Sequence, residues 1–141
     1  MLHNYNPLAL FVFLTASVHV NAVPTPLDPG PFFNSAILYA SSYAGQIQSL
    51  KLSQSNGAYS LNTLDYYYGC APNASWLTVD YSKKVMYCVN EALNGGNGSL
   101  LSYGLGSAGS GKLTEKGKLK IMGGAVHSGL FDHDNALAVA H

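Results

Sequence analysis

The feature that most constrains this chain is an order of short strands that returns with a period of about fifty residues. Apolar runs at residues 37–41 and 85–89 are each followed by a polar break, a second strand, a Gly-bearing turn and a third strand. A further apolar run at residues 136–140 opens the same order again. After Ala22 no window carries a helical period, so we expect an almost purely β chain beyond that residue.

The period and the strand lengths predict the blades of a β-propeller, whose repeats contain several short strands. One blade cannot bury both of its faces, so such a unit is stable only beside other units in a ring. The unbroken apolar run at 85–89 fits a strand covered on both faces. The predicted strands are residues 37–42, 46–52, 58–64, 76–80, 85–90, 99–105, 113–121, 127–131 and 136–140.

The first 22 residues have the pattern of a secretory signal peptide. An apolar stretch at 7–18 precedes Val20-Asn21-Ala22, which has the small-residue ending that signal peptidase reads. A buried N-terminal helix and an uncleaved anchor are the alternatives. Residues 23–35 contain four prolines and are expected to form an extended lead-in, which leaves residues 36–141 for the propeller. We therefore predict a secreted protein without a membrane span after cleavage.

Two other features agree with secretion. Asn73-Ala74-Ser75 and Asn97-Gly98-Ser99 are sequons for N-glycosylation, both in predicted loops. Cys70 and Cys88 are the two cysteines, and in an oxidising compartment we expect one disulfide between them. Two buried free thiols on neighbouring strands are the alternative. No spacing of Cys and His suggests a metal site, and no cofactor is expected.

Charge composition narrows the classes of partner. Seven lysines balance seven acidic residues, and the chain contains no arginine. There is no basic field to attract nucleic acid. A phosphorylated substrate is ordinarily bound by an arginine, whose guanidinium donates two parallel hydrogen bonds to the phosphate.

Several segments together resemble the seven-bladed propeller lactonases, a family that includes 6-phosphogluconolactonases of the propeller type and carboxymuconate cyclases. They are residues 72–80 (PNASWLTVD), 85–91 (VMYCVNE), 98–100 (GSL) and 123–127 (GGAVH). The secretory features and the Cys pair are similar to the fungal extracellular branch. The resemblance implies a ring of seven blades, of which this chain would supply about two to two and a half four-stranded antiparallel ones, as an N-terminal fragment lacking the C-terminal blades.

The resemblance also implies an activity. The expected enzyme is a lactonase (a carboxylic ester hydrolase) or a lactone-forming cyclase, acting on a sugar or muconate-type acid. Family catalysis is ascribed to His, Arg and Glu groups around the central channel, mostly in later blades, so we expect this fragment to be inactive alone. The alternatives are a non-catalytic secreted propeller that binds carbohydrate or protein, and a truncated product without activity.

Two residues are candidates for the catalytic site. His127 starts an inner strand, where it would face the channel, and an imidazole suits acid–base chemistry at neutral pH. The alternative is a histidine at the edge of a loop, or a core histidine whose ring nitrogens are hydrogen-bonded. Glu91 follows the apolar strand and would lie at the channel mouth, unless it is only a turn residue. Tyr66-Tyr67-Tyr68 forms either a stacking surface for sugars or an aromatic strand end packed on the next blade.

Overall fold

The computed structural model describes residues 35–56 and 58–141, which form nine β-strands and no helix. The expected signal helix (1–22) and nearly all of the Pro-rich lead-in (23–35) lie outside the described residues. No helix able to cross a membrane occurs within the described ranges. The strands are β1 (Ser35–Ser41), β2 (Ile47–Ser55), β3 (Ala58–Tyr67), β4 (Ala74–Asp80), β5 (Val85–Asn90), β6 (Asn97–Leu105), β7 (Leu113–Met122), β8 (His127–Phe131) and β9 (Ala136–Ala140).

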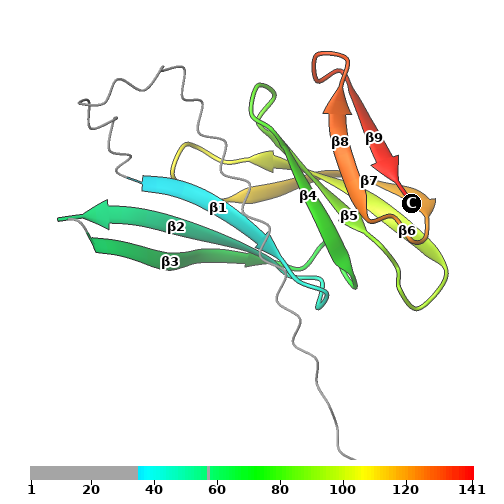
Figure 1. Cartoon of the computed structure of the whole chain (residues 1–141), viewed down its shortest axis with the longest axis horizontal. Coiled ribbons are helices and arrows are strands. Elements are labelled where there is room, and N and C mark those ends of the chain that lie inside the picture. Colours follow the sequence, from blue (N-terminus) through cyan, green and yellow to red (C-terminus); the bar gives the residue numbers. More distant parts are fainter. Residues whose placement is uncertain (1–34, 57) are drawn as a thin grey trace, which may run out of the picture.

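These strands form three antiparallel sheets whose strand order follows the chain. They are β1-β2-β3, β4-β5-β6-β7 and β8-β9, and Figure 1 shows them one after another from β1 to β9. The β8-β9 hairpin repeats the β4-β5 hairpin in register, since Trp76 pairs with Val89 and His127 pairs with Ala140. The first sheet accordingly corresponds to β5-β6-β7. The prediction of an all-β partial propeller is confirmed, with three described strands in the first blade, four in the second and two in the third.

The central strand β5 is covered fully on one face and partly on the other, where Val89 is buried but Val85 and Tyr87 are half-buried. In β5, Met86, Cys88 and Val89 are fully buried. The face that meets the first sheet holds the main hydrophobic core, which contains Ile47, Cys70, Ala74, Leu77, Met86, Cys88, Leu101, Tyr103 and Leu113, with Tyr39 and Tyr67 packed against it. The core therefore lies between blades, which is why a single blade of this sequence has no core of its own.

The first strands of the second and third blades, β4 and β8, lie side by side, and β4 also contacts β1 of the first sheet. Side-chain hydrogen bonds connect β4 to β8, because Thr78 Oγ1 donates to the Ser128 carbonyl at 2.8 Å. Near the start of β4, Ser75 Oγ donates to the carbonyl of Ala125, which precedes β8, at 3.0 Å. These contacts hold β4 and β8 as neighbouring inner strands of the ring.

A bulge changes which tyrosines of β3 face the core. Ser49 pairs with Asp65 but Leu50 pairs with Thr63, so Leu64 is left out of the ladder and the side-chain alternation shifts there. Tyr67 turns toward the second blade, where its hydroxyl accepts a hydrogen bond from the Leu113 amide at 2.9 Å. β3 also runs to Tyr67, three residues beyond the predicted end at 64, because its pairing with β2 continues past the bulge.

The disulfide between Cys70 and Cys88 is confirmed. The S–S distance is 2.00 Å, the Cα atoms are 6.3 Å apart, and neither residue is exposed. Cys70 belongs to the connection between the first and second sheets, and Cys88 lies in β5. The bond therefore fastens the interblade connection to the centre of the second blade.

Candidate functional site

The start of the third blade places His127 on a tryptophan. His127 is the first residue of β8 and is exposed to solvent. Its ring centroid is 4.1 Å from that of Trp76, a half-buried residue of β4, and the two ring planes are tilted by 45°. Trp76 therefore contacts one side of the imidazole near the end where the inner strands begin.

Sequence reasoning did not single out Trp76, although a signal was present. Trp76 and His127 occupy the same register position of consecutive hairpins, opposite Val89 and Ala140. Equivalent positions of neighbouring inner strands face each other in a propeller, so the repeat alone pointed to their contact. His141, also passed over, lies at the same end, with its Nδ1 3.4 Å from the Gly123 carbonyl oxygen.

Glu91 is a buried carboxylate that joins several loops. Its side chain accepts a hydrogen bond from the Tyr43 hydroxyl at 3.1 Å, and Tyr43 belongs to the β1–β2 loop. Its amide donates to the Asn73 carbonyl at 2.9 Å, and its carbonyl accepts from the Gly124 amide at 2.8 Å. Gly124 has φ +81°, a backbone conformation that favours glycine. The residue is thus more than a turn residue, because it connects the β1–β2, β3–β4 and β7–β8 loops.

The Glu91 carboxylate affects its neighbour Tyr43. Burial raises the pKa of the Tyr43 hydroxyl, and the hydrogen bond to the Glu91 carboxylate raises that pKa further. A protonated hydroxyl is the donor that this contact requires, so the pKa shift and the hydrogen bond agree.

Asn90, the neighbour of Glu91, has a structural role in the same region. Its Oδ1 accepts from the Asn73 amide at 3.1 Å, and its Nδ2 donates to the Ala71 carbonyl at 2.8 Å. Its side chain is buried, and both its Oδ1 and its Nδ2 are hydrogen-bonded. Asn90 therefore holds the interblade connection in place and is not a group that faces substrate.

The two predicted catalytic residues lie at the same end of the sheets but have different partners. The side chain of Glu91 contacts Tyr43, and the ring of His127 contacts Trp76. They are linked through the β7–β8 loop, in which Gly124 binds the Glu91 backbone and the chain then enters β8. Within residues 35–56 and 58–141, no group of three or more His, Cys, Asp or Glu side chains is arranged to hold a metal ion.

The two sequon asparagines differ in environment. Asn73 is only 8% exposed, and its Oδ1 accepts a hydrogen bond from the Leu93 amide at 3.1 Å. Asn97 is exposed and is the first residue of β6, one position into a strand where the sequence suggested a loop. Asn97 is therefore accessible to solvent, whereas the buried Asn73 side chain is part of the loop structure.

Comparison with known proteins identifies one family. The sequence model described as "Lactonase, 7-bladed beta-propeller" matches residues 37–141, which is most of the chain. Neither a curated protein nor a solved structure shows significant similarity to this chain. The matched range begins in β1 and includes all three sheets.

Proposed function

The chain belongs to the seven-bladed β-propeller lactonase family, and we propose that it contributes the first blades of a secreted propeller that hydrolyses or forms lactones of sugar or muconate-type acids. The observation that carries the proposal is the His127–Trp76 pair at the start of an inner strand. An exposed imidazole that contacts an aromatic ring at this end is suited to proton transfer at a bound lactone.

The proposed reaction is a ring-ester hydrolysis with proton transfer to and from His127. A water oxygen bonds to the lactone carbonyl carbon while the imidazole accepts a water proton. The bond between that carbon and the ring oxygen then breaks, and the imidazolium returns the proton to the departing oxygen. Lactone closure is the same sequence in reverse. Such acid–base assistance contributes about 10²- to 10⁴-fold in rate.

Glu91 is assigned a supporting role in this proposal. Its carboxylate is held by the Tyr43 hydroxyl and its backbone by Gly124, in the loop that leads to His127. A carboxylate so placed can accept a hydrogen bond from a sugar hydroxyl at the mouth of the channel. The absence of arginine from the chain favours an unphosphorylated lactone, at least for contacts made by these blades.

Activity is proposed for a more complete ring and not for these three sheets alone. The two strands of the third sheet cover only part of the second blade. Beside them lies an open hollow lined by Tyr87, Leu100, Ser102, Gly117, Lys118 and Leu119. Leu119 is 62% exposed there. Further strands packed in this hollow would complete the third blade, as the family architecture requires.

Secretion and glycosylation are part of the same proposal. This part of the proposal is supported by the leader pattern at 1–22, the buried disulfide and the exposed sequon at Asn97. An oxidising compartment is where such a disulfide persists. Of the two sequons, we assign the glycan to Asn97.

The single tryptophan of the chain provides the test. Sugar lactones and carboxymuconolactone are added to this chain while the emission of Trp76 is followed. Hydrolysis of the same lactones is assayed in parallel on the protein that contains the complete ring. We expect a lactone to change the emission, and His127→Ala to lower hydrolysis about 10²-fold. His133→Ala is the matched control, because His133 is exposed in the β8–β9 turn. The proposal is wrong if no lactone changes the emission and none is hydrolysed.

A non-catalytic propeller that binds carbohydrate is the second candidate. The exposed tyrosines of β3 favour it. Binding of a glycan without hydrolysis of any lactone would separate it from the enzyme proposal.

A further inference from the structure

The connection between β5 and β6 contains two asparagines that are each followed by glycine. The sequence Asn94-Gly95-Gly96-Asn97-Gly98 covers the end of this loop and the start of β6. Asparagine is a chemically labile residue, and it loses its side-chain amide most readily before glycine. Glycine has no Cβ that would keep its own amide nitrogen away from the carbonyl carbon of the asparagine side chain. The local structure then decides which of the two steps can react.

The first step, Asn94-Gly95, lies in an open part of the loop. Asn94 is exposed, and its side chain makes no hydrogen bond to another described residue. A Cβ built on Gly95, which has φ +84°, would meet nothing within 4 Å apart from its chain neighbours, so this peptide has room to rotate. The Gly95 amide donates one turn hydrogen bond, to the Ala92 carbonyl at 3.1 Å. That bond is the one that must open before the nitrogen can react.

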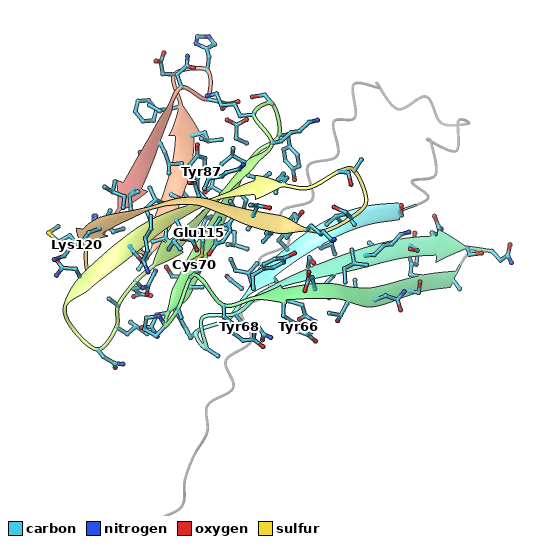
Figure 2. The ribbon with its side chains drawn as sticks, turned by 180° about the vertical axis from the view of Figure 1, so that it is seen from behind. Tyr66, Tyr68, Cys70, Tyr87, Glu115 and Lys120 are labelled. Carbon is cyan, nitrogen blue, oxygen red and sulfur yellow. A yellow bond between two sulfur atoms is a disulfide. The ribbon has the colours of Figure 1, made fainter. Side chains whose placement is uncertain are left out.

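The accessibility of Asn94 does not depend on which blades are present. The β5–β6 loop connects two strands of the same blade, and in Figure 2 this yellow-green loop projects from the end of the second sheet. Neighbouring blades pack on the two faces of a sheet. A further blade would therefore not bury the tip of this loop.

The second step, Asn97-Gly98, is held on both sides. Both residues belong to the ladder between β6 and β7, where Gly98 pairs with Ile121. Gly98 is buried, and a Cβ built on it would lie 2.6 Å from the Asn90 carbonyl oxygen and 2.8 Å from that of Met122. This part of the backbone cannot rotate unless the sheet opens.

We propose that Asn94 is a site of spontaneous deamidation, which places a new carboxylate in the β5–β6 loop. The Gly95 nitrogen gives up its proton to water and bonds to the side-chain carbonyl carbon of Asn94. The bond from that carbon to the side-chain nitrogen breaks, and ammonia leaves with a proton taken from water, so a succinimide ring remains. Water then adds to either carbonyl carbon of the ring and breaks its bond to the ring nitrogen, which leaves an aspartate or an isoaspartate at position 94. In sum, one amide and one water become one acid and one ammonia.

The new charge would change the mouth of the proposed lactone site. Glu91 begins the same loop, and the loop lies against the β7–β8 loop, since a Cβ built on Gly123 would be 2.5 Å from the Gly96 carbonyl oxygen. An added negative charge here disfavours an anionic lactone of the muconate type more than a neutral sugar lactone. This consequence rests on the proposed function, whereas the deamidation itself does not.

The test is peptide mapping by mass spectrometry while the full chain is incubated at mildly alkaline pH. The protein is secreted into a bacterial periplasm, where the disulfide can form and Asn97 carries no N-glycan. We expect Asn94 to convert to aspartate and isoaspartate about tenfold faster than Asn97 or more, because opening the β6 ladder costs more free energy than opening one loop bond. In urea the two peptides should react at similar rates. Asn94→Gln should remove the loop product and leave the Asn97 peptide unchanged.

Two results would overturn the inference. They are an Asn94 side chain that stays an amide in the folded protein while it converts in urea, and equal rates at Asn94 and Asn97 in the folded protein. Neither result depends on lactone hydrolysis, so the inference fails or holds separately from the enzyme proposal. In the protein that contains the complete ring, the deamidated form should then lose more activity on carboxymuconolactone than on sugar lactones, relative to Asn94→Gln. Equal losses on both would contradict the effect of the added charge.

Discussion

The imidazole of His127 lies on the indole of Trp76, with 4.1 Å between the ring centroids. The two residues occupy the same register position of neighbouring inner strands. The contact is therefore part of the packing between the second and third blades. It also places the predicted catalytic histidine beside the only tryptophan of the chain.

Removing the imidazole should change the emission of that tryptophan. In His127→Ala, one face of the Trp76 ring gains contact with water, so its fluorescence maximum is expected to shift to longer wavelength. His133→Ala should leave the spectrum unchanged, because His133 lies in the turn at the other end of β8. Identical spectra for the wild type and His127→Ala would show that the two rings are not in contact in solution.

The disulfide should make a large contribution to stability. Cys70 and Cys88 close a loop with a sequence separation of 18 residues and are both fully buried. The double variant Cys70→Ser/Cys88→Ser is expected to lower the free energy of unfolding by about 3 kcal/mol. Urea unfolding followed by Trp76 emission measures this, with the reduced wild-type protein as the comparison. Equal midpoints for the oxidised, reduced and double-serine proteins would contradict the expectation.

Asp80 should make stability depend on acid pH. The Ser82 hydroxyl donates to Oδ1 at 2.7 Å and the Lys83 amide donates to it at 2.8 Å, and these bonds lower the pKa of the Asp80 carboxyl. The stabilisation is complete above the unfolded-state pKa of about 3.9 and is lost as the pH falls through the lower folded-state pKa.

The measurement is the urea midpoint between neutral and acid pH. Asp80→Asn is expected to be less stable at neutral pH and to lose less stability on acidification. Ser82→Ala should show a smaller change in the same direction. The same acid dependence in the wild type and in Asp80→Asn would mean that another carboxyl is responsible.

Tyr103 should make stability depend on alkaline pH. Burial, together with the charge of Glu115, raises the pKa of the Tyr103 hydroxyl to about 12. Stabilisation from keeping this hydroxyl protonated is present below the unfolded-state pKa of about 10 and is lost as the pH rises through the folded-state value. In a spectrophotometric titration, Tyr103→Phe should therefore remove a tyrosine that ionises late.

The same variant tests an unpaired buried hydroxyl. Tyr103 OH is buried without a hydrogen-bond partner among the described residues. Tyr103→Phe should leave stability unchanged or increase it by about 1 kcal/mol at neutral pH, since the unsatisfied polar group is removed and the ring remains. A clear loss of stability in thermal unfolding would indicate a partner for the hydroxyl that the described structure does not contain.

Glycosylation should be confined to one of the two sequons. In a secreting host, we expect the intact mass to show one N-glycan, which Asn97→Gln removes. Asn73→Gln should leave the glycan mass unchanged and lower stability, because Asn73 Oδ1 holds the Leu93 amide and the side chain is buried. A glycan found on Asn73 in the folded protein would contradict the assignment.

The sequence by itself determined the strands, their order and the family, because these depend on local patterns. The turn at Asn56 and the apolar run at Val85–Asn90 are local signals, and the spacing of the hairpins identifies repeated blades. The Cys70–Cys88 pairing was also predictable, since the chain has only two cysteines.

Only the tertiary structure decided which side chains meet. The bulge at Leu64 turns Tyr67 into the core and Tyr66 outward, and neither hydrophobicity nor alternation in the sequence reveals a single skipped residue. The burial of Asn73 and the bond from Tyr43 to Glu91 likewise depend on loops from different blades. The physical reason is that the core of this fold lies between blades, so its contacts join residues that are far apart in the chain.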